Sequence, residues 1–296
     1  MRAVILCVIL VWLGLAPLSF ATPKCAQTPI DLLTPLAPCP SAHWRADRRE
    51  NWAALAAAAP DRAAARVDAA FIRKRLALLK ELSAPQAEIA PSQWPQFAGS
   101  TAGFRAAYAG SKNSRVRALL RRAIADQIIR FAIADVRQDA LLNGASERVR
   151  DQWSGFIVNE MAAIDCANTR WLYRQIVRHG WFISSVFGRE ADHAAWLLVQ
   201  HADAEPRFQR EALRLLESLP AGETRLQNIA LLWDRVAVSE GRTQRFATQM
   251  RCIDGAMQPV GGVEEGVDAH RKAAGLPPLA DYRALLAKIY RCGAGA

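Results

Sequence analysis

The stretch GWFISSVFGREADHAAWLLVQHADAEPRFQ, from Gly180 to Gln209, indicates the fold of this chain. Within it, Ala194, Leu197 and Leu198 follow the i, i+3, i+4 spacing of an amphipathic helix, and His201 is the next residue on the same face. The two glycines of the stretch mark breaks on its N-terminal side. We therefore predict a buried helix that ends at His201, with the rest of the chain packed around it.

Polar residues gather at the end of this predicted helix. Trp196, Gln200 and Asp203 share a second face by the same helical arithmetic. Asp203 also precedes Pro206 by less than one turn, which predicts that it caps the N-terminus of the next helix. The helix end is therefore the first place where we look for a functional site.

The remaining segments predict a helix-dominated chain. Proline, glycine and asparagine separate stretches with helical periodicity. Asp254-Gly255, between FATQMRCI and AMQPV, predicts a type I′ turn and a short hairpin within about residues 245–260. The fold class is therefore mainly α, with one short β-hairpin. The expected helices are Trp44–Ala58, Asp61–Glu81, Phe97–Tyr108, Arg115–Leu142, Ser146–Ile164, Asp165–His179, Asp203–Leu219, Thr224–Ser239, Val267–Ala274 and Pro278–Arg291.

The N-terminus resembles a secretory signal peptide. Met1 and Arg2 precede an uncharged apolar run that ends in the small-x-small pattern Ser19-Phe20-Ala21. An uncleaved anchor is the alternative reading, because the run is just long enough to span a bilayer. We expect cleavage after Ala21 and a periplasmic or secreted protein.

Shifts in composition along the sequence divide the chain into three predicted parts. Residues 1–21 form the signal peptide, residues 22–96 a Pro-rich extension with one or two helices, and residues 97–296 a helical domain. No second long apolar run follows the signal peptide, so no transmembrane anchor is expected after its cleavage.

Export would place the cysteines in an oxidising compartment. One cysteine lies in the predicted signal peptide and five follow it, so an odd one remains. Our preferred pairs are Cys252–Cys292, which would fix the C-terminal tail, and Cys25–Cys39, which would close a Pro-rich loop. This pairing leaves Cys166 as the free thiol.

The composition narrows the classes of partner. The formal net charge of +10 comes mostly from arginines spread over amphipathic helices, and no stripe of aromatic and basic residues accompanies them. Nucleic acid is therefore not an expected partner, whereas loose adhesion to anionic lipid or cell wall stays open. The sequence contains no phosphate-binding loop, nucleophile elbow, zinc spacing or HExxH motif, so we expect no cofactor and no metal.

His201 is the strongest catalytic candidate. It titrates near neutral pH and stands beside Asp203, and a histidine oriented by a carboxylate can act as a general base. Asp234 and Arg235 follow the apolar run IALLW, and Arg235 could hold an oxyanion or substrate carbonyl. The structural alternative is that His201 complements the helix dipole while Asp203 caps the next helix.

Other polar residues sit in apolar surroundings and are candidates for ligand binding. Asp126 and Arg130 have the i, i+4 spacing of a surface ion pair, yet isoleucines and a phenylalanine surround them. An inward charge must be paired, because isolated burial is costly. The expected ligand-binding residues are Asp126, Gln127, Arg130, Trp181, Gln200, Gln209, Gln244, Thr248 and Gln249.

Several of these motifs occur together in one known family. LLVQHAD at Leu197–Asp203 and GRTQRFATQ at Gly241–Gln249, with DQIIR at Asp126–Arg130, resemble the bacterial family called domain of unknown function 6624. The resemblance covers about Val116–Tyr282 and implies a domain boundary but no activity. Phe246-Ala247 departs from it, because the family has Tyr-Gly at these two positions.

Two functions fit these observations. The first is an exported helical domain that binds a small polar ligand or a cell-envelope partner through a polar cluster around His201. The second is a hydrolase-like enzyme in which His201 is the general base, Asp203 orients it, and Arg235 or Gln249 holds the substrate. Both expect His201, Asp126, Asp234 and Gln249 to converge in the fold.

Overall fold

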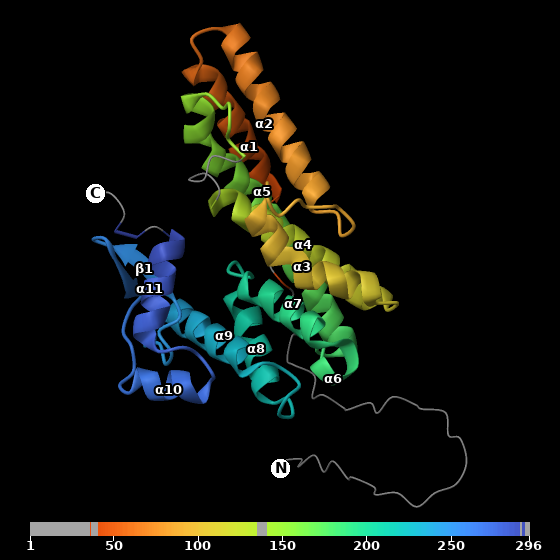
Figure 1. Cartoon of the computed structure of the whole chain (residues 1–296), viewed down its shortest axis with the longest axis vertical. Coiled ribbons are helices and arrows are strands. Elements are labelled where there is room, and N and C mark those ends of the chain that lie inside the picture. The colour runs from red at the N-terminus through yellow and green to blue at the C-terminus, as the bar shows by residue number, and fades with distance from the viewer. Residues whose placement is uncertain (1–35, 37–40, 135–140, 291, 294–296) are drawn as a thin grey trace, which may run out of the picture.

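The structure, a computed structural model, describes residue 36 and residues 41–134, 141–290 and 292–293 (Figure 1). Within these ranges the chain is mainly α-helical, with a single two-stranded antiparallel sheet, as the sequence predicts. The elements are α1 Ser41–Ala58, α2 Arg62–Leu82, α3 Pro95–Gly110, α4 Ser114–Ala134, α5 Glu147–His179, α6 Ser184–Phe187, α7 Arg189–Gln200, α8 Pro206–Glu217, α9 Leu226–Ser239, β1 Met250–Ile253, β2 Ala256–Pro259, α10 Val267–Ala273 and α11 Leu279–Tyr290.

Helix α7 is the central element, which confirms the prediction from its spacing. It contacts α3, α4, α5, α8 and α9, and it is buried on nearly every side from Ala194 to Gln200. Figure 1 shows it between the long helices at one end of the molecule and the C-terminal elements at the other. His201 follows its last turn, so the end of this buried helix sets the position of the histidine.

Helices α1 and α2 fall within the segment predicted as an extension. Both pack against α5, and α2 also contacts α4. Leu55 of α1 and Ile72 and Leu79 of α2 belong to the same buried cluster as the residues of α7. These two helices therefore share one hydrophobic core with the rest of the described chain.

Two predicted helix boundaries are wrong. The helix expected to break after Ile164 continues without interruption from Glu147 to His179. No glycine or proline occurs in this stretch after Gly155, and a lone aspartate is a weak stop signal inside a helix. The helix expected to reach Leu142 is described as α4 up to Ala134, residues 135–140 lie outside the described chain, and Leu142 itself lies in a turn.

The hairpin forms as predicted. Strands β1 and β2 pair antiparallel, and Ile253 faces Ala256 across the two-residue loop. Asp254 and Gly255 have φ of 50° and 74°, both positive as a type I′ turn requires. The hairpin packs against α11 near the C-terminus.

A disulfide joins Cys252 of β1 to Cys292 after α11, with the two Cα atoms 5.6 Å apart, and this prediction is confirmed. Cys166 is also disulfide-bonded, so the expectation that it is the free thiol is wrong. Cys166 was left over only because the other four cysteines had been paired by preference, and a sequence alone does not determine connectivity. Cys25 and Cys39 lie outside the described residues.

No helix in the described part of the chain combines the length and apolar character that a bilayer crossing needs. The predicted signal peptide, residues 1–21, lies outside this part.

Candidate functional site

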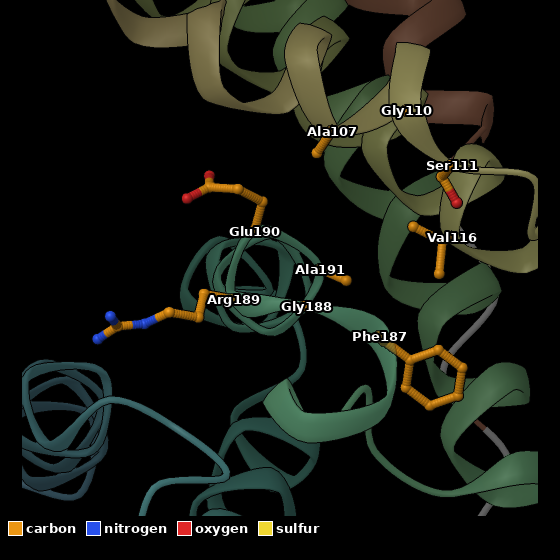
Figure 2. Close-up of a pocket in the computed structure, with 9 residues that line it drawn as sticks. All are labelled: Ala107, Gly110, Ser111, Val116, Phe187, Gly188, Arg189, Glu190 and Ala191. Carbon is orange, nitrogen blue, oxygen red and sulfur yellow. The ribbon is translucent and has the colours of Figure 1, made fainter.

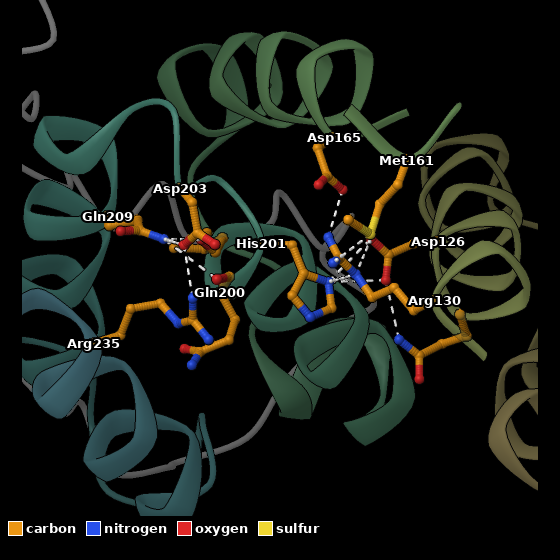
Figure 3. A network of polar contacts seen from close by, with 11 residues as sticks. Asp126, Arg130, Met161, Asp165, Gln200, His201, Asp203, Gln209 and Arg235 are labelled. Carbon is orange, nitrogen blue, oxygen red and sulfur yellow. Dashed lines mark hydrogen bonds and ion pairs between the residues drawn. The ribbon is translucent and has the colours of Figure 1, made fainter. Parts of the chain in front are cut away.

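His201 is oriented by Asp126, not by Asp203. The imidazole Nδ1 lies 3.0 and 2.9 Å from the two carboxylate oxygens of Asp126, which comes from the middle of α4 (Figure 3). Asp126 is fully buried, whereas the His201 side chain keeps 16% of its surface exposed. The predicted pairing with Asp203 is wrong because the chain turns after α7 and carries Asp203 toward α9.

Arg130 completes this arrangement from the next turn of α4. Its Nε donates to Oδ1 of Asp126 at 3.3 Å and to Nδ1 of His201 at 2.8 Å. Nδ1 accepts from Arg130 in one tautomer and donates to Asp126 in the other, because the role of an imidazole nitrogen depends on where the ring proton lies. In the tautomer that donates to Asp126, the Nε2 lone pair points away from the carboxylate.

The Asp126 carboxylate is kept ionised by its partners. Burial alone would raise its pKa, but the positive charge of His201 when its ring is protonated, the hydrogen bond with His201, the charge of Arg130 and a hydrogen bond from Gln127 hold the pKa below its ordinary value. Gln127 donates its Nε2 to Asp126 at 3.0 Å. The predicted residues Asp126, Gln127, Arg130 and His201 therefore meet in one network, which we call the His201 network.

Asp165 joins the His201 network, although the sequence analysis assigned it only to a helix start. It accepts from Nη2 of Arg130 at 2.6 Å, while Nη1 of Arg130 contacts the sulfur of Met161 at 3.1 Å. Burial, together with the negative charges of Asp126 and Asp203, raises the pKa of Asp165 to about 7 against the opposing effect of Arg130. An aspartate in the middle of a helix would have marked Asp165 as a candidate, but the predicted break after Ile164 placed it at the start of a helix instead.

We expect Asp165→Asn to become more stable relative to wild type as the pH rises from 4 to 8. A carboxyl whose pKa rises from 3.8 to about 7 on folding favours the folded state below its unfolded pKa, and this contribution is lost as pH rises to 7. Asparagine does not titrate, so the variant does not lose this contribution. Allowing for partial exposure of Asp165, the unfolding free energy of the variant should rise by about 2 kcal/mol relative to that of wild type over this pH range.

Urea unfolding at both pH values measures the difference. Asp151→Asn, which removes an exposed carboxylate from the same helix, is the matched control and should follow wild type. Parallel pH profiles for wild type and Asp165→Asn would contradict the elevated pKa.

Asp203 belongs to an adjacent group with Gln200, Gln209 and Arg235. Its Oδ1 accepts from Nη1 of Arg235 at 2.7 Å and from Nε2 of Gln209 at 3.1 Å. Gln209 also donates to the backbone oxygens of Val199 and Gln200, at 3.2 and 3.3 Å. Asp203 is therefore not the predicted helix cap: α8 begins at Pro206 after a Glu205 that makes no side-chain cap bond.

Asp234 faces a different part of the molecule from its neighbour Arg235. It accepts the backbone N–H groups of Arg245, Phe246 and Thr248 at 2.8, 3.1 and 2.8 Å. Burial raises the pKa of Asp234, although these hydrogen bonds oppose the rise. The expected catalytic role of Asp234 is not supported, because this carboxylate is fully buried and fixes the loop before β1.

Gln244, Thr248 and Gln249 belong to this loop as well. The Gln244 side chain donates to the backbone oxygens of Gln249 and Val260 and accepts from the Gln249 N–H. Thr248 accepts from Nε2 of Gln249, and its backbone oxygen accepts from the Tyr282 hydroxyl. Among the described residues, no hydrogen bond or ion pair joins these three residues to His201, and their side chains bond within the loop instead.

Ala247 in the same loop has φ of 50° and is fully buried. A positive φ favours glycine, which the family pattern has at this position. The ring of Phe246, where the family pattern has tyrosine, packs edge-on against Trp233 and His270. The loop therefore holds an alanine in a backbone conformation that glycine adopts more readily.

Trp181, predicted to bind a ligand, is buried away from the His201 network. Its Nε1 donates to Asp192 at 2.8 Å, and Thr224 and Asn228 donate to the other oxygen of that carboxylate at 3.2 and 3.3 Å. Asp192 has no exposed surface. This cluster joins α7, α9 and the loop before α6, and its role is structural.

A surface pocket of about 380 Å³ lies between the α3–α4 turn and the start of α7 (Figure 2). Ser111, Val116 and Phe187 line it together with Arg189 and Glu190. It contains none of the residues of the His201 network. Among the described residues, no group of three histidine, cysteine, aspartate or glutamate side chains is arranged to hold a metal ion.

Comparison with known proteins gives one match. No curated protein and no solved structure is similar to this chain. The model of a family of unknown function, DUF6624, matches residues 117–293, which is more than half of the chain and includes the His201 network. The chain therefore belongs to the DUF6624 family.

Proposed function

We propose that the His201 network is the acid–base centre of a hydrolase-like enzyme that acts on a small polar substrate. The observation that carries this proposal is the contact of both Asp126 oxygens with Nδ1 of His201, at 3.0 and 2.9 Å. A buried carboxylate that holds the Nδ1 proton fixes the ring and leaves Nε2 as a base.

The charges around His201 suit proton transfer. When Nε2 takes a proton from water or from a substrate hydroxyl, the Asp126 carboxylate stabilises the imidazolium that forms. Asp165, with its pKa near 7, is partly protonated at neutral pH and can supply a proton to a leaving group. Two titratable groups with different environments are the pattern expected of an acid and a base.

A purely structural role explains this network less well. A sealed polar cluster would have every member paired and covered, whereas the side chains of His201 and Arg130 keep 16% and 23% of their surface exposed. The exposed carboxylate of Asp203 beside His201 also supports the simpler alternative, in which this surface binds a polar ligand without turning it over.

The disulfide supports export to an oxidising compartment. Structural disulfides such as Cys252–Cys292 persist outside the cytoplasm and are rare within it. Together with the predicted signal peptide at residues 1–21, this favours a periplasmic or secreted enzyme whose substrate is a small molecule or a component of the cell envelope.

The test is His201→Gln, assayed on a panel of p-nitrophenyl esters and amino-acid p-nitroanilides between pH 5 and 9. Loss of a general base typically slows turnover by about 10²–10⁴-fold, so we expect a drop in this range with little change in melting temperature. His179→Gln, which alters an exposed histidine at the end of α5, is the control and should keep wild-type turnover.

Two results would count against the proposal. Equal turnover in wild type and His201→Gln would exclude His201 as the base. A large fall in the melting temperature of His201→Gln would assign the ring to the folded core instead.

A further inference from the structure

We infer that Gln200, Asp203 and Arg235 form a subsite for a carboxamide, the group of a peptide bond, next to His201. This inference deepens the proposed function, because it names the substrate class that the acid–base centre would act on. It stands on side-chain atoms that the His201 network does not use.

Gln200 is the last residue of α7, and only 5% of it is exposed. Its side-chain oxygen Oε1 is buried and has no hydrogen-bond partner among the described residues. Buried side-chain oxygens are nearly always paired in native proteins, so an unpaired one indicates a missing partner. The neighbouring amide of Gln209, by contrast, donates to three oxygens.

Arg235 supplies an unpaired donor in the same region. Its Nη1 is bound to Asp203 at 2.7 Å, but its Nε is buried without a partner in the described chain. The two residues are tied together through Gln209, which donates both to Asp203 Oδ1 and to the backbone oxygen of Gln200. Figure 3 shows the Gln200 amide and the Arg235 guanidinium on the same side of His201.

The chemistry of these two atoms selects the ligand. Oε1 of Gln200 needs a donor, and Nε of Arg235 needs an acceptor. A carboxamide N–H and C=O provide one of each. A carboxylate would leave Oε1 unpaired and an ammonium group would leave Nε unpaired, and each unpaired buried group weakens binding. If the side-chain amide of Gln200 were rotated by 180°, its NH₂ group would take the place of Oε1 and the site would favour a carboxylate. Amide and carboxylate probes distinguish these two orientations.

The subsite is adjacent to the catalytic base. Gln200 directly precedes His201, and Asp203 follows two residues later. In Figure 3 the ring of His201 lies between this group and the pair Asp126 and Arg130. A carboxamide bound here would therefore lie on the side of the imidazole opposite Asp126 and Arg130, within the neighbourhood in which a general base acts. The exposed carboxylate of Asp203 can accept a further donor from the same substrate.

The experiment is an NMR titration of the purified protein with N-methylacetamide, which has both a donor and an acceptor. The signals followed are the side-chain ¹⁵N–¹H resonances of Gln200 and of Arg235 Nε. We expect saturable shifts of both signals, and about tenfold weaker binding of N,N-dimethylacetamide, which lacks the donor. Gln200→Leu should weaken N-methylacetamide binding by about tenfold for the same reason, whereas His179→Gln, at an exposed position at the end of α5, should bind it as wild type does.

Sodium acetate and methylammonium are the competing probes. Shifts with acetate and none with N-methylacetamide would overturn the carboxamide assignment in favour of a carboxylate, and no response to any probe would overturn the subsite. The outcome is separable from the proposed function. If His201→Gln stops turnover but no amide binds, the subsite fails and the acid–base centre stands. If the amide binds and His201→Gln retains full turnover, the acid–base centre fails and the subsite stands.

Discussion

Asp126→Asn is expected to lower the free energy of unfolding by about 1–3 kcal/mol at neutral pH. The Asp126 carboxylate has no exposed surface and is the shared partner of Arg130 and His201. Asparagine has nearly the same shape, so the substitution removes the charge and little else. Arg130 keeps Asp165 as a second carboxylate partner at 2.6 Å, so the loss is that of one buried, charged acceptor, about 1–3 kcal/mol. Urea unfolding of wild type and variant measures the loss.

The pH dependence of the stability difference between wild type and Asp126→Asn provides an independent test of this loss. The pKa of Asp126 is held below its ordinary value in the folded state, so its stabilising contribution is present above the unfolded pKa and is lost as pH falls through the folded pKa. The gap between wild type and Asp126→Asn should therefore be full at pH 7 and shrink below pH 3.8, the ordinary value. Asp151→Asn, at an exposed position, should change stability by less than about 0.5 kcal/mol. A loss for Asp126→Asn no larger than this control would contradict a buried ion pair.

The same variant also separates a positioning role of Asp126 from a purely structural one. An asparagine side chain can donate to Nδ1 of His201, which would move the neutral ring proton to Nε2. Imidazole ¹⁵N shifts distinguish the two tautomers. We expect the Nδ1–H form in wild type and the Nε2–H form in Asp126→Asn, and an unchanged tautomer would show that Asp126 does not orient the ring.

The helical pattern could be predicted because it depends on local spacing. The i, i+3, i+4 repeat through Ala194, Leu197 and Leu198 is a property of one segment, and that segment is buried as expected. The turn at Asp254-Gly255 is equally local, because positive φ at both residues is a property of those two residues. Each prediction used only forces that act within a few residues.

The partner of His201 could not be found in this way. Asp203 is two residues away in sequence but points to Arg235, whereas Asp126, 75 residues away, contacts the ring because α4 packs on α7. The choice between two carboxylates is made by helix packing, which a single sequence does not contain. The motif DQIIR identified Asp126 and Arg130 as polar groups in an apolar helix, but not the group that they face.

Neighbours in sequence also diverged because of helix geometry. Asp234 and Arg235 are consecutive residues of α9, and successive residues of a helix point about 100° apart. One therefore reaches the loop at Arg245–Thr248 and the other reaches Asp203. The polar candidates therefore bond in separate groups: the loop residues and Trp181 pair with their own neighbours, and the His201 network holds the oriented, partly exposed histidine.

The disulfide between Cys252 and Cys292 is expected to contribute about 4 kcal/mol to the free energy of unfolding, mostly by restricting the unfolded chain. The two cysteines are 40 residues apart, and closing a loop of this length costs the unfolded state about 4 kcal/mol of entropy. The bond joins the hairpin to the end of α11, whose helix has no fully buried residue of its own. The disulfide therefore has a larger share in holding α11 in place than it would have for a helix with a large buried face.

The double variant Cys252→Ser/Cys292→Ser tests this bond in isolation, since a reductant would also open the disulfide of Cys166. Without reductant, the variant should unfold at a lower urea concentration than wild type by an amount equal to about 4 kcal/mol. With dithiothreitol both proteins lack the bond, so the gap between them should close. A gap that persists after reduction would mean that serine disturbs the packing of the hairpin on α11, and no gap in the oxidised proteins would mean that the bond does not constrain the unfolded chain.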